Sequence, residues 1–200
     1  VRYVVLGDDF RFGADRQGDI EFIREQGLRY GYATGSTPTF AVQGERVSST
    51  RIREALEKAD FATAEALLGR PYSISGRVIF GRQLGQVIGT RTANLQLRRL
   101  RAPLSGVYTV EVSGGGLENA PCVANVGVRP TVDDSIRANL EVHLLDREID
   151  LYGRHIEVTF RHKLREEMKF GSVAELRENI ARDIEKTRAW FSRGQNSKKI

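Results

Sequence analysis

Six short segments rich in β-forming residues follow one another through the last two thirds of the chain, separated by clusters of glycine and proline. They are residues 72–80, 92–97, 106–112, 122–126, 139–145 and 156–162. Short runs between turn signals are typical of the strands of a small antiparallel barrel or sandwich. This region therefore predicts an all-β domain.

A single long helix is predicted after the last of these strands. Ser172 and Glu175 have the spacing of a capping box, in which side chains satisfy backbone N–H groups of the first helical turn. An apolar stripe follows at helical spacing: Val173, Leu176, Ile180, Ile184 and Phe191. We expect this stripe to lie on the β-domain.

The first part of the chain has a different pattern, in which a strand-like run at residues 1–6 precedes helical segments. A helix is predicted over residues 19–26 with Gly27 as its stop, and Asp60 is predicted to cap a short helix that ends at Gly69. Strands alternating with helices are typical of an α/β domain.

We therefore predict an α+β protein of two domains. Residues 1–69 would be the tail of an α/β domain, and residues 70–200 would be the β-domain with its terminal helix. Because the chain opens at Val1 directly into a strand, we expect it to be a piece of a longer protein.

Glycines and polar donors alternate between the first two strands of the β-domain. Gly81, Gly85 and Gly89 allow the backbone to approach a phosphate chain, where successive N–H groups can bind the anion. Thr92 and Asn94 alternate on the following strand and so point to one face, where their oxygens suit Mg²⁺ carried by a nucleotide. On spacing alone, a glycine-containing hairpin without a ligand is the favoured interpretation of the same residues.

A second candidate lies on a strand in which apolar and polar residues alternate. If Leu140, Val142 and Leu144 face the core, Glu141 and His143 share the opposite face. A carboxylate there could act as a general base. The solvated side of a strand is the alternative interpretation.

The composition limits the classes of function. Lys and Arg number 31 against 26 Asp and Glu, and the formal net charge of +5 suits an anionic ligand such as a nucleotide. The basic balance also leaves a nucleic-acid-binding barrel open, although aromatic residues make up only 8% of the chain and the arginines are mixed with acids. One cysteine excludes an intramolecular disulfide and a cysteine-clustered metal site. No apolar run approaches the roughly 20 residues of a membrane span, so we expect a cytoplasmic protein that acts on small molecules, with no nucleic-acid or membrane partner.

Considered together and in order, the motifs of this chain resemble the bacterial bifunctional riboflavin kinase and FMN adenylyltransferase (FAD synthetase) family. The resemblance covers nearly the whole chain, and its strongest pieces are residues 7–10, 48–53, 68–72, 92–94, 106–108, 125–131, 140–143 and 151–153. It implies a nucleotidyltransferase α/β domain followed by a six-stranded antiparallel kinase barrel with a terminal helix. It also implies ATP- and Mg²⁺-dependent phosphorylation of riboflavin to FMN.

The resemblance assigns roles to several residues of the barrel. Gly81, Gly85 and Gly89 would contact ATP, Thr92 and Asn94 would hold Mg²⁺ and the ATP phosphates, and Glu141 would be the catalytic base. The implied flavin-binding residues are Asn125, Arg129, Arg165 and Phe170. Relatives usually have Phe-Pro where this chain has Thr90 and Arg91, and a basic residue where it has Gln86, which keeps a non-catalytic flavin-binding module open as a third interpretation.

In the amino-terminal part, the nucleotide-binding motif that remains is residues 48–53. Its matched residues would contact ATP phosphates at a helix start: Ser48, Ser49, Thr50, Arg51 and Arg53. The family's early His-containing nucleotide motif has no counterpart in these 200 residues. We therefore expect the conversion of FMN to FAD to be absent from this chain.

Overall fold

The structure is a computed structural model that describes residues 1–79, 92–97, 102–130, 136–146 and 149–196. The chain divides into two compact units, Val1–Arg51 and Ile52–Ile200. The predicted domain boundary between residues 69 and 70 stays a prediction. Within the described residues, no helix has the length and apolar character needed to cross a membrane.

The first unit is built on a strand-helix-strand crossover. Strands β1 (Tyr3–Gly7) and β2 (Ala33–Thr37) pair in parallel, and helix α1 (Ile20–Tyr30) lies between them in the chain. The remaining elements of the unit are the 3₁₀ turn η1 (Ala14–Arg16) and the short hairpin of β3 (Ala41–Val42) with β4 (Glu45–Arg46). Parallel strands joined through a helix are the pattern expected of the tail of an α/β domain.

The predicted end of α1 at Gly27 is wrong. The helix continues to Tyr30, and Gly31 ends it with a left-handed backbone at φ 74°. Gly27 is instead a packing residue, because a Cβ atom there would lie 2.6 Å from the carbonyl oxygen of Tyr32. The start of the helix is as predicted, since the Asp19 side chain accepts a hydrogen bond from the Phe22 N–H.

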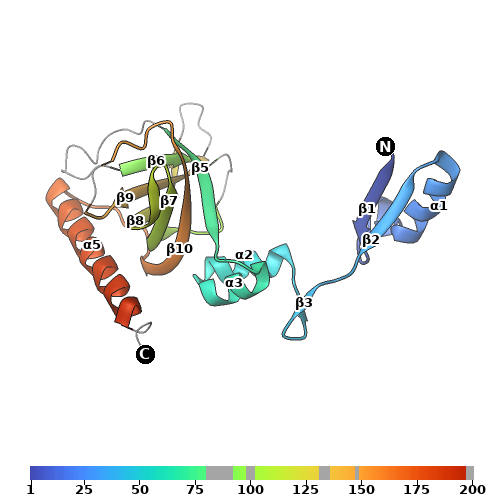
Figure 1. Ribbon diagram of the computed structural model, residues 1–200, viewed down its shortest axis with the longest axis horizontal. Helices are drawn as coiled ribbons and strands as arrows, with labels where there is room; N and C mark the ends of the chain where they lie inside the picture. Colours follow the sequence, from blue (N-terminus) through green and yellow to red (C-terminus); the bar gives the residue numbers. More distant parts are fainter. Residues whose placement is uncertain (80–91, 98–101, 131–135, 147–148, 197–200) are drawn as a thin grey trace. The chain divides into compact units, whose positions relative to one another are not determined.

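The second unit contains a closed antiparallel barrel of six strands, which confirms the predicted fold class (Figure 1). Its strands are β5 (Ser73–Ile79), β6 (Thr92–Gln96), β7 (Gly106–Gly114), β8 (Leu117–Pro130), β9 (Ile136–Leu144) and β10 (His155–Arg165). They follow the order β10-β5-β6-β9-β8-β7 around the barrel. Alternate side chains fill the interior, as Leu140 and Val142 on β9 illustrate.

Two short helices precede the barrel, α2 (Ser49–Glu57) and α3 (Phe61–Leu68). Asp60 caps α3 by accepting a hydrogen bond from the Thr63 N–H, and Gly69 ends the helix, as predicted. Phe61 packs against the barrel residues Tyr108 and Phe160, with ring centroids 6.0 and 6.2 Å away. The apolar cluster of the barrel therefore includes residues of both helices.

Helix α5 (Val173–Asn196) lies alongside the barrel (Figure 1). Ser172 caps it by accepting a hydrogen bond from the Glu175 N–H at 3.1 Å, as predicted. The predicted apolar stripe is only partly buried, and Val173 is exposed. Among the residues of this helix whose side chains are described, the buried ones are polar, Asp183 and Thr187. The sequence pattern therefore located the helix but missed the polar groups by which it contacts the barrel.

Candidate functional site

A pocket with a cavity volume of about 170 Å³ lies between the barrel and helix α5. Its barrel wall consists of Thr92, Val107, Val123, Asn125, Glu141 and His143. Its other wall consists of Arg165, Glu167, Met168, Phe170 and the α5 residues Leu176, Ile180 and Asp183. One wall is thus mainly polar and strand-built, and the other carries most of the large apolar groups.

The polar wall is ordered by strand register. Glu141 on β9 lies opposite Asn94 of β6 on one side and opposite Asn125 of β8 on the other. His143 lies opposite Thr92 of β6 in the same way. Because cross-strand neighbours share a face, the structure brings together the predicted metal ligands, the predicted base and one predicted flavin contact.

Glu141 is half-buried, and its Oε1 atom accepts a hydrogen bond from Nδ2 of Asn139 at 3.1 Å. The two residues are neighbours on the same face of β9, since side chains alternate along a strand. The bond helps to orient the carboxylate beside the pocket. Sequence reasoning missed Asn139, although its position two residues before Glu141 was the available signal.

Asn125 carries a buried acceptor. Its Oδ1 atom is the one buried side-chain oxygen or nitrogen without a hydrogen-bond partner in the described part of the chain. Leaving such a group unsatisfied costs about 1–3 kcal/mol. Because the residue lines the pocket, a ligand that donates a hydrogen bond there would recover this free energy.

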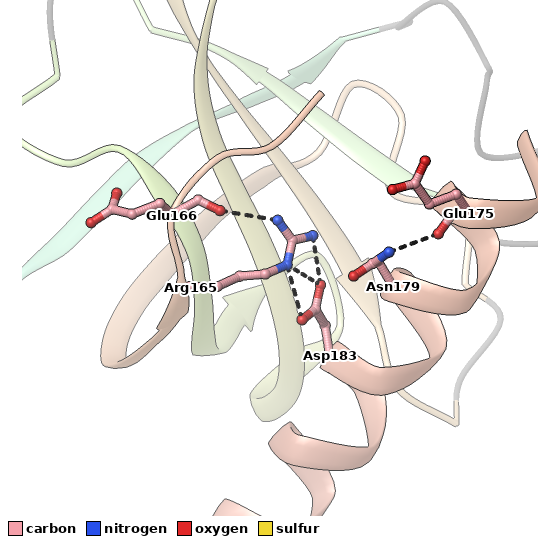
Figure 2. Close-up of polar contacts among 5 residues, drawn as sticks. All are labelled: Arg165, Glu166, Glu175, Asn179 and Asp183. Atoms are coloured by element: carbon pink, nitrogen blue, oxygen red, sulfur yellow. Dashed lines mark hydrogen bonds and ion pairs between the residues drawn. The ribbon is translucent and has the colours of Figure 1, made fainter. Parts of the chain in front are cut away.

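The segment after β10, residues 166–170, is here called the strap. Figure 2 shows Arg165 between this segment and α5, with its guanidinium directed at the carboxylate of Asp183. The Arg165 Nη1 atom also donates a hydrogen bond to the carbonyl oxygen of Glu166 at 3.0 Å. Further along the strap, the Glu167 carboxylate packs against Gly127 of β8 so closely that a Cβ atom at residue 127 would overlap it.

Not every predicted site residue can be placed in the pocket. Gly81, Gly85 and Gly89 lie outside the described residues, as do the departures at Gln86, Thr90 and Arg91. Arg129 pairs through its backbone with Arg137 on β9, and its side chain also lies outside the description. The roles predicted for these residues stay predictions.

The predicted nucleotide motif, residues 48–53, forms the start of α2. Ser48 accepts a hydrogen bond from the Arg51 N–H at 3.2 Å, and the Arg51 side chain bonds the carbonyl oxygen of Arg46 and pairs with Glu45. Ser49, Thr50 and Arg53 are exposed. An N-cap with ion pairs explains these contacts, and the phosphate-binding role stays a prediction.

The pocket also contains residues that sequence reasoning did not select, above all Asp183. A signal for it existed, because Asp183 follows Ile180 by three positions and Leu176 by seven, on the predicted apolar face. A carboxylate on a buried helix face requires a partner. The partner, Arg165, could only be identified from the tertiary structure.

Comparison with protein-family models gave two matches. The family described as riboflavin kinase matches residues 68–191, which contain the whole barrel and most of α5. The family described as FAD synthetase matches residues 1–51, which correspond to the first compact unit.

Curated relatives carry the same two functions in their names. The bifunctional riboflavin kinase/FMN adenylyltransferase of Escherichia coli (strain K12) is 52% identical over 191 residues, which are 96% of this chain and 61% of that protein. The protein of the same name from Pseudomonas fluorescens is 49% identical over 189 residues, 94% of this chain and 60% of that protein. The chain thus spans about three fifths of the length of these relatives.

A solved structure illustrates the similarity over most of the chain. A crystal structure described as a macrolide-efflux protein from Streptococcus pneumoniae aligns with a TM-score of 0.68 and 32% identity, over 92% of this chain and 59% of that one. The alignment supports the arrangement of strands and helices within each unit.

Proposed function

Because this chain belongs to the riboflavin kinase family, we propose that its barrel transfers the γ-phosphoryl group of ATP to the 5′-hydroxyl of riboflavin. The products are FMN and ADP. The observation that carries the proposal is the position of Glu141, in register between Asn94 and Asn125 on the wall of a pocket.

Glu141 is the general base of the proposed reaction. Its carboxylate takes the proton of the 5′-hydroxyl while that oxygen forms a bond to the γ-phosphorus and the bond to the β–γ bridging oxygen breaks. The hydrogen bond from Asn139 holds the carboxylate in place for this transfer. Phosphoryl transfer depends mainly on positioning and on stabilisation of charge, and a base fixed on a barrel strand supplies the first of these.

Thr92 and Asn94 are the proposed ligands of a divalent cation, Mg²⁺, that accompanies ATP. A hydroxyl and an amide oxygen are hard ligands, and Mg²⁺ is commonly held by few protein groups together with substrate phosphates. Among the described residues no cluster of three or more His, Cys, Asp or Glu is placed to hold a metal, which agrees with a cation held largely by its nucleotide. The cation would neutralise charge on the phosphates as they react. Gly81, Gly85 and Gly89 remain proposed phosphate contacts.

The flavin is proposed to occupy the pocket between the barrel and α5. Its ring system is flat and largely apolar, which suits the wall formed by Met168, Phe170 and Leu176. Its imide and ribityl groups can donate hydrogen bonds, and the buried Oδ1 atom of Asn125 requires a donor. Arg129 and Arg165 complete the proposed flavin-binding set.

The first unit is proposed to contribute to a second activity of the whole protein, the adenylylation of FMN to FAD. Its match to FAD synthetase and the bifunctional names of the relatives support this proposal. Ser48, Ser49, Thr50, Arg51 and Arg53 are the proposed contacts to ATP phosphates at the start of α2.

The test is incubation of the purified chain with riboflavin and MgATP, followed by chromatography of the flavins. FMN and ADP should appear in equal amounts, and omission of the divalent cation should stop both. Binding of riboflavin without any FMN would indicate a non-catalytic flavin-binding module instead. Salt-dependent binding of single-stranded nucleic acid, without flavin binding, would indicate the nucleic-acid-binding barrel.

A further inference from the structure

We infer that Asp183 is a positioning residue for the pocket. It acts through Arg165, which contacts the strap of residues 166–170. The inference rests on the proposed function, since the pocket that Asp183 organises is the one proposed to bind riboflavin. Asp183 lies on α5 and Arg165 at the end of β10, so the pair joins two elements of the second unit.

The contact between the two side chains is multiple and shielded. Nε of Arg165 donates to both carboxylate oxygens of Asp183, at 3.2 and 3.1 Å, and Nη2 donates to Oδ2 at 2.8 Å. The side chains are only 18% and 4% exposed. A forked, largely buried pair of this kind fixes the orientation of the guanidinium as well as its position.

The oriented guanidinium in turn contacts both ends of the strap. Nη1 donates to the carbonyl oxygen of Glu166 at 3.0 Å, and Cζ lies 5.6 Å from the ring centroid of Phe170 (Figure 2 shows the first of these contacts). A cation at this distance from an aromatic ring is attracted to its face. Asp183, Arg165 and the two strap residues therefore form a connected set, called here the clasp.

The clasp supports the wall that faces the barrel. Glu167, Met168 and Phe170 of the strap line the pocket beside Leu176 and Ile180 of α5. A ligand site needs its walls held by supporting contacts, because a small displacement weakens binding. The polar wall of β6, β8 and β9 has its own strand pairing, so loss of the clasp should affect the flavin and spare the nucleotide.

The barrel offers a matched control. Glu111 on β7 and Arg161 on β10 form another partly buried ion pair, with Nε and Nη2 donating to Oε2 at 2.9 and 2.6 Å. Neither residue lines the pocket. The variants Glu111→Gln and Asp183→Asn each remove one carboxylate charge from an ion pair with an arginine of β10. Only Asp183→Asn changes the clasp.

The experiment compares Asp183→Asn, Glu111→Gln and the unmodified 200-residue chain. Three quantities are measured: the riboflavin Kd from flavin fluorescence, the KM values for riboflavin and ATP, and the backbone NMR order parameters of the strap without ligands. In Asp183→Asn the Kd and KM for riboflavin should rise roughly 10- to 100-fold. The KM for ATP should stay within about threefold, on a scale where tenfold is 1.4 kcal/mol. The order parameters of residues 166–170 should fall in this variant and stay unchanged in Glu111→Gln.

If Asp183→Asn does not fold, the double variant Arg165→Met with Asp183→Leu replaces the pair by apolar groups, a change that often preserves stability. A folded double variant should bind riboflavin weakly and should also show lowered order parameters in residues 166–170, which the loss of a direct contact between Arg165 and the flavin would not cause. Riboflavin binding equal to that of the unmodified chain, in either folded variant, overturns the inference. A loss of riboflavin affinity of the same size in Glu111→Gln also overturns the inference.

The two hypotheses can fail separately. If the unmodified chain neither binds nor phosphorylates riboflavin, the proposed function is wrong, and the order parameters alone decide on the clasp. Unchanged order parameters of residues 166–170 in Asp183→Asn then overturn it. Lowered order parameters support the clasp as a set of contacts that holds the strap for a different ligand.

Discussion

The hydroxyl groups of Thr109 on β7 and Thr187 on α5 share a hydrogen bond of 3.1 Å, and both side chains are fully buried. Together with Asp183 one turn earlier, Thr187 gives the face of α5 toward the barrel a polar seam. Buried polar groups of this kind favour one arrangement of the helix, because any shift would leave them without partners.

The seam predicts a non-additive effect on stability. Thr187→Val should lower the free energy of unfolding by about 1–3 kcal/mol, because it leaves the Thr109 hydroxyl buried without its partner. The double variant Thr109→Val with Thr187→Val should recover most of this loss, since both polar groups are then gone. Urea denaturation of the three proteins measures the effect. A double variant that loses more free energy of unfolding than Thr187→Val would contradict the role given to the hydrogen bond.

A second prediction concerns the contact between the strap and β8. Gly127→Ala places a methyl group where the Glu167 carboxylate lies, so this side chain must leave its place on the pocket wall. Riboflavin binding should weaken by roughly three- to tenfold, about 0.7–1.4 kcal/mol. Gly76→Ala on β5 is the control, because a Cβ atom there meets only Leu95 Cδ2 at an ordinary 3.4 Å. Titration of flavin fluorescence compares the two variants. Equal affinities would mean that the position of the Glu167 carboxylate does not matter for the ligand.

A third prediction follows from the buried phenol of Tyr108. Burial, with the Glu166 charge as a second cause, raises the pKa of Tyr108 to about 12. A raised pKa means that the folded chain retains the proton more strongly than the unfolded chain, whose tyrosine titrates near 10. The neutral phenol therefore contributes fully to stability below about pH 10. Between about pH 10 and 12 this contribution is lost, and the free energy of unfolding falls by roughly 2 kcal/mol.

Denaturation at several values between pH 9 and 12, in the unmodified chain and in Tyr108→Phe, measures this contribution. The two stabilities should converge as the pH rises, because the variant has no phenol to ionise. A constant difference across the range would show that the folded chain does not hold the phenol neutral.

Much of the fold was accessible from local patterns. Glycine and proline between short β-rich runs located all six barrel strands, and Asp60 and Gly69 located both ends of α3. These signals are local, since a cap or turn depends on a few neighbouring residues. Gly27 was misinterpreted because a glycine required by packing and one required by a left-handed backbone look alike in sequence.

The candidate site could be predicted only in part, because local sequence patterns do not report contacts between distant parts of the chain. Strand alternation placed Glu141 and His143 on one face, and the structure places both on the pocket wall. The clasp of Asp183 with Arg165, the contact of Glu167 with Gly127, and the pairing of Thr109 with Thr187 join elements that only the folded chain brings together. No local periodicity reports such contacts.

Glu141 is the proposed base that accepts the riboflavin proton, and the kcat for FMN formation by Glu141→Gln measures whether it does. Glutamine keeps the shape and an acceptor oxygen but cannot take a proton, so kcat should fall roughly 10²- to 10⁴-fold while thermal melting stays close to that of the unmodified chain. Glu118→Gln, on the exposed part of β8, should leave kcat unchanged. A folded Glu141→Gln variant with a kcat within about threefold of the unmodified chain, where tenfold corresponds to 1.36 kcal/mol, would contradict the account.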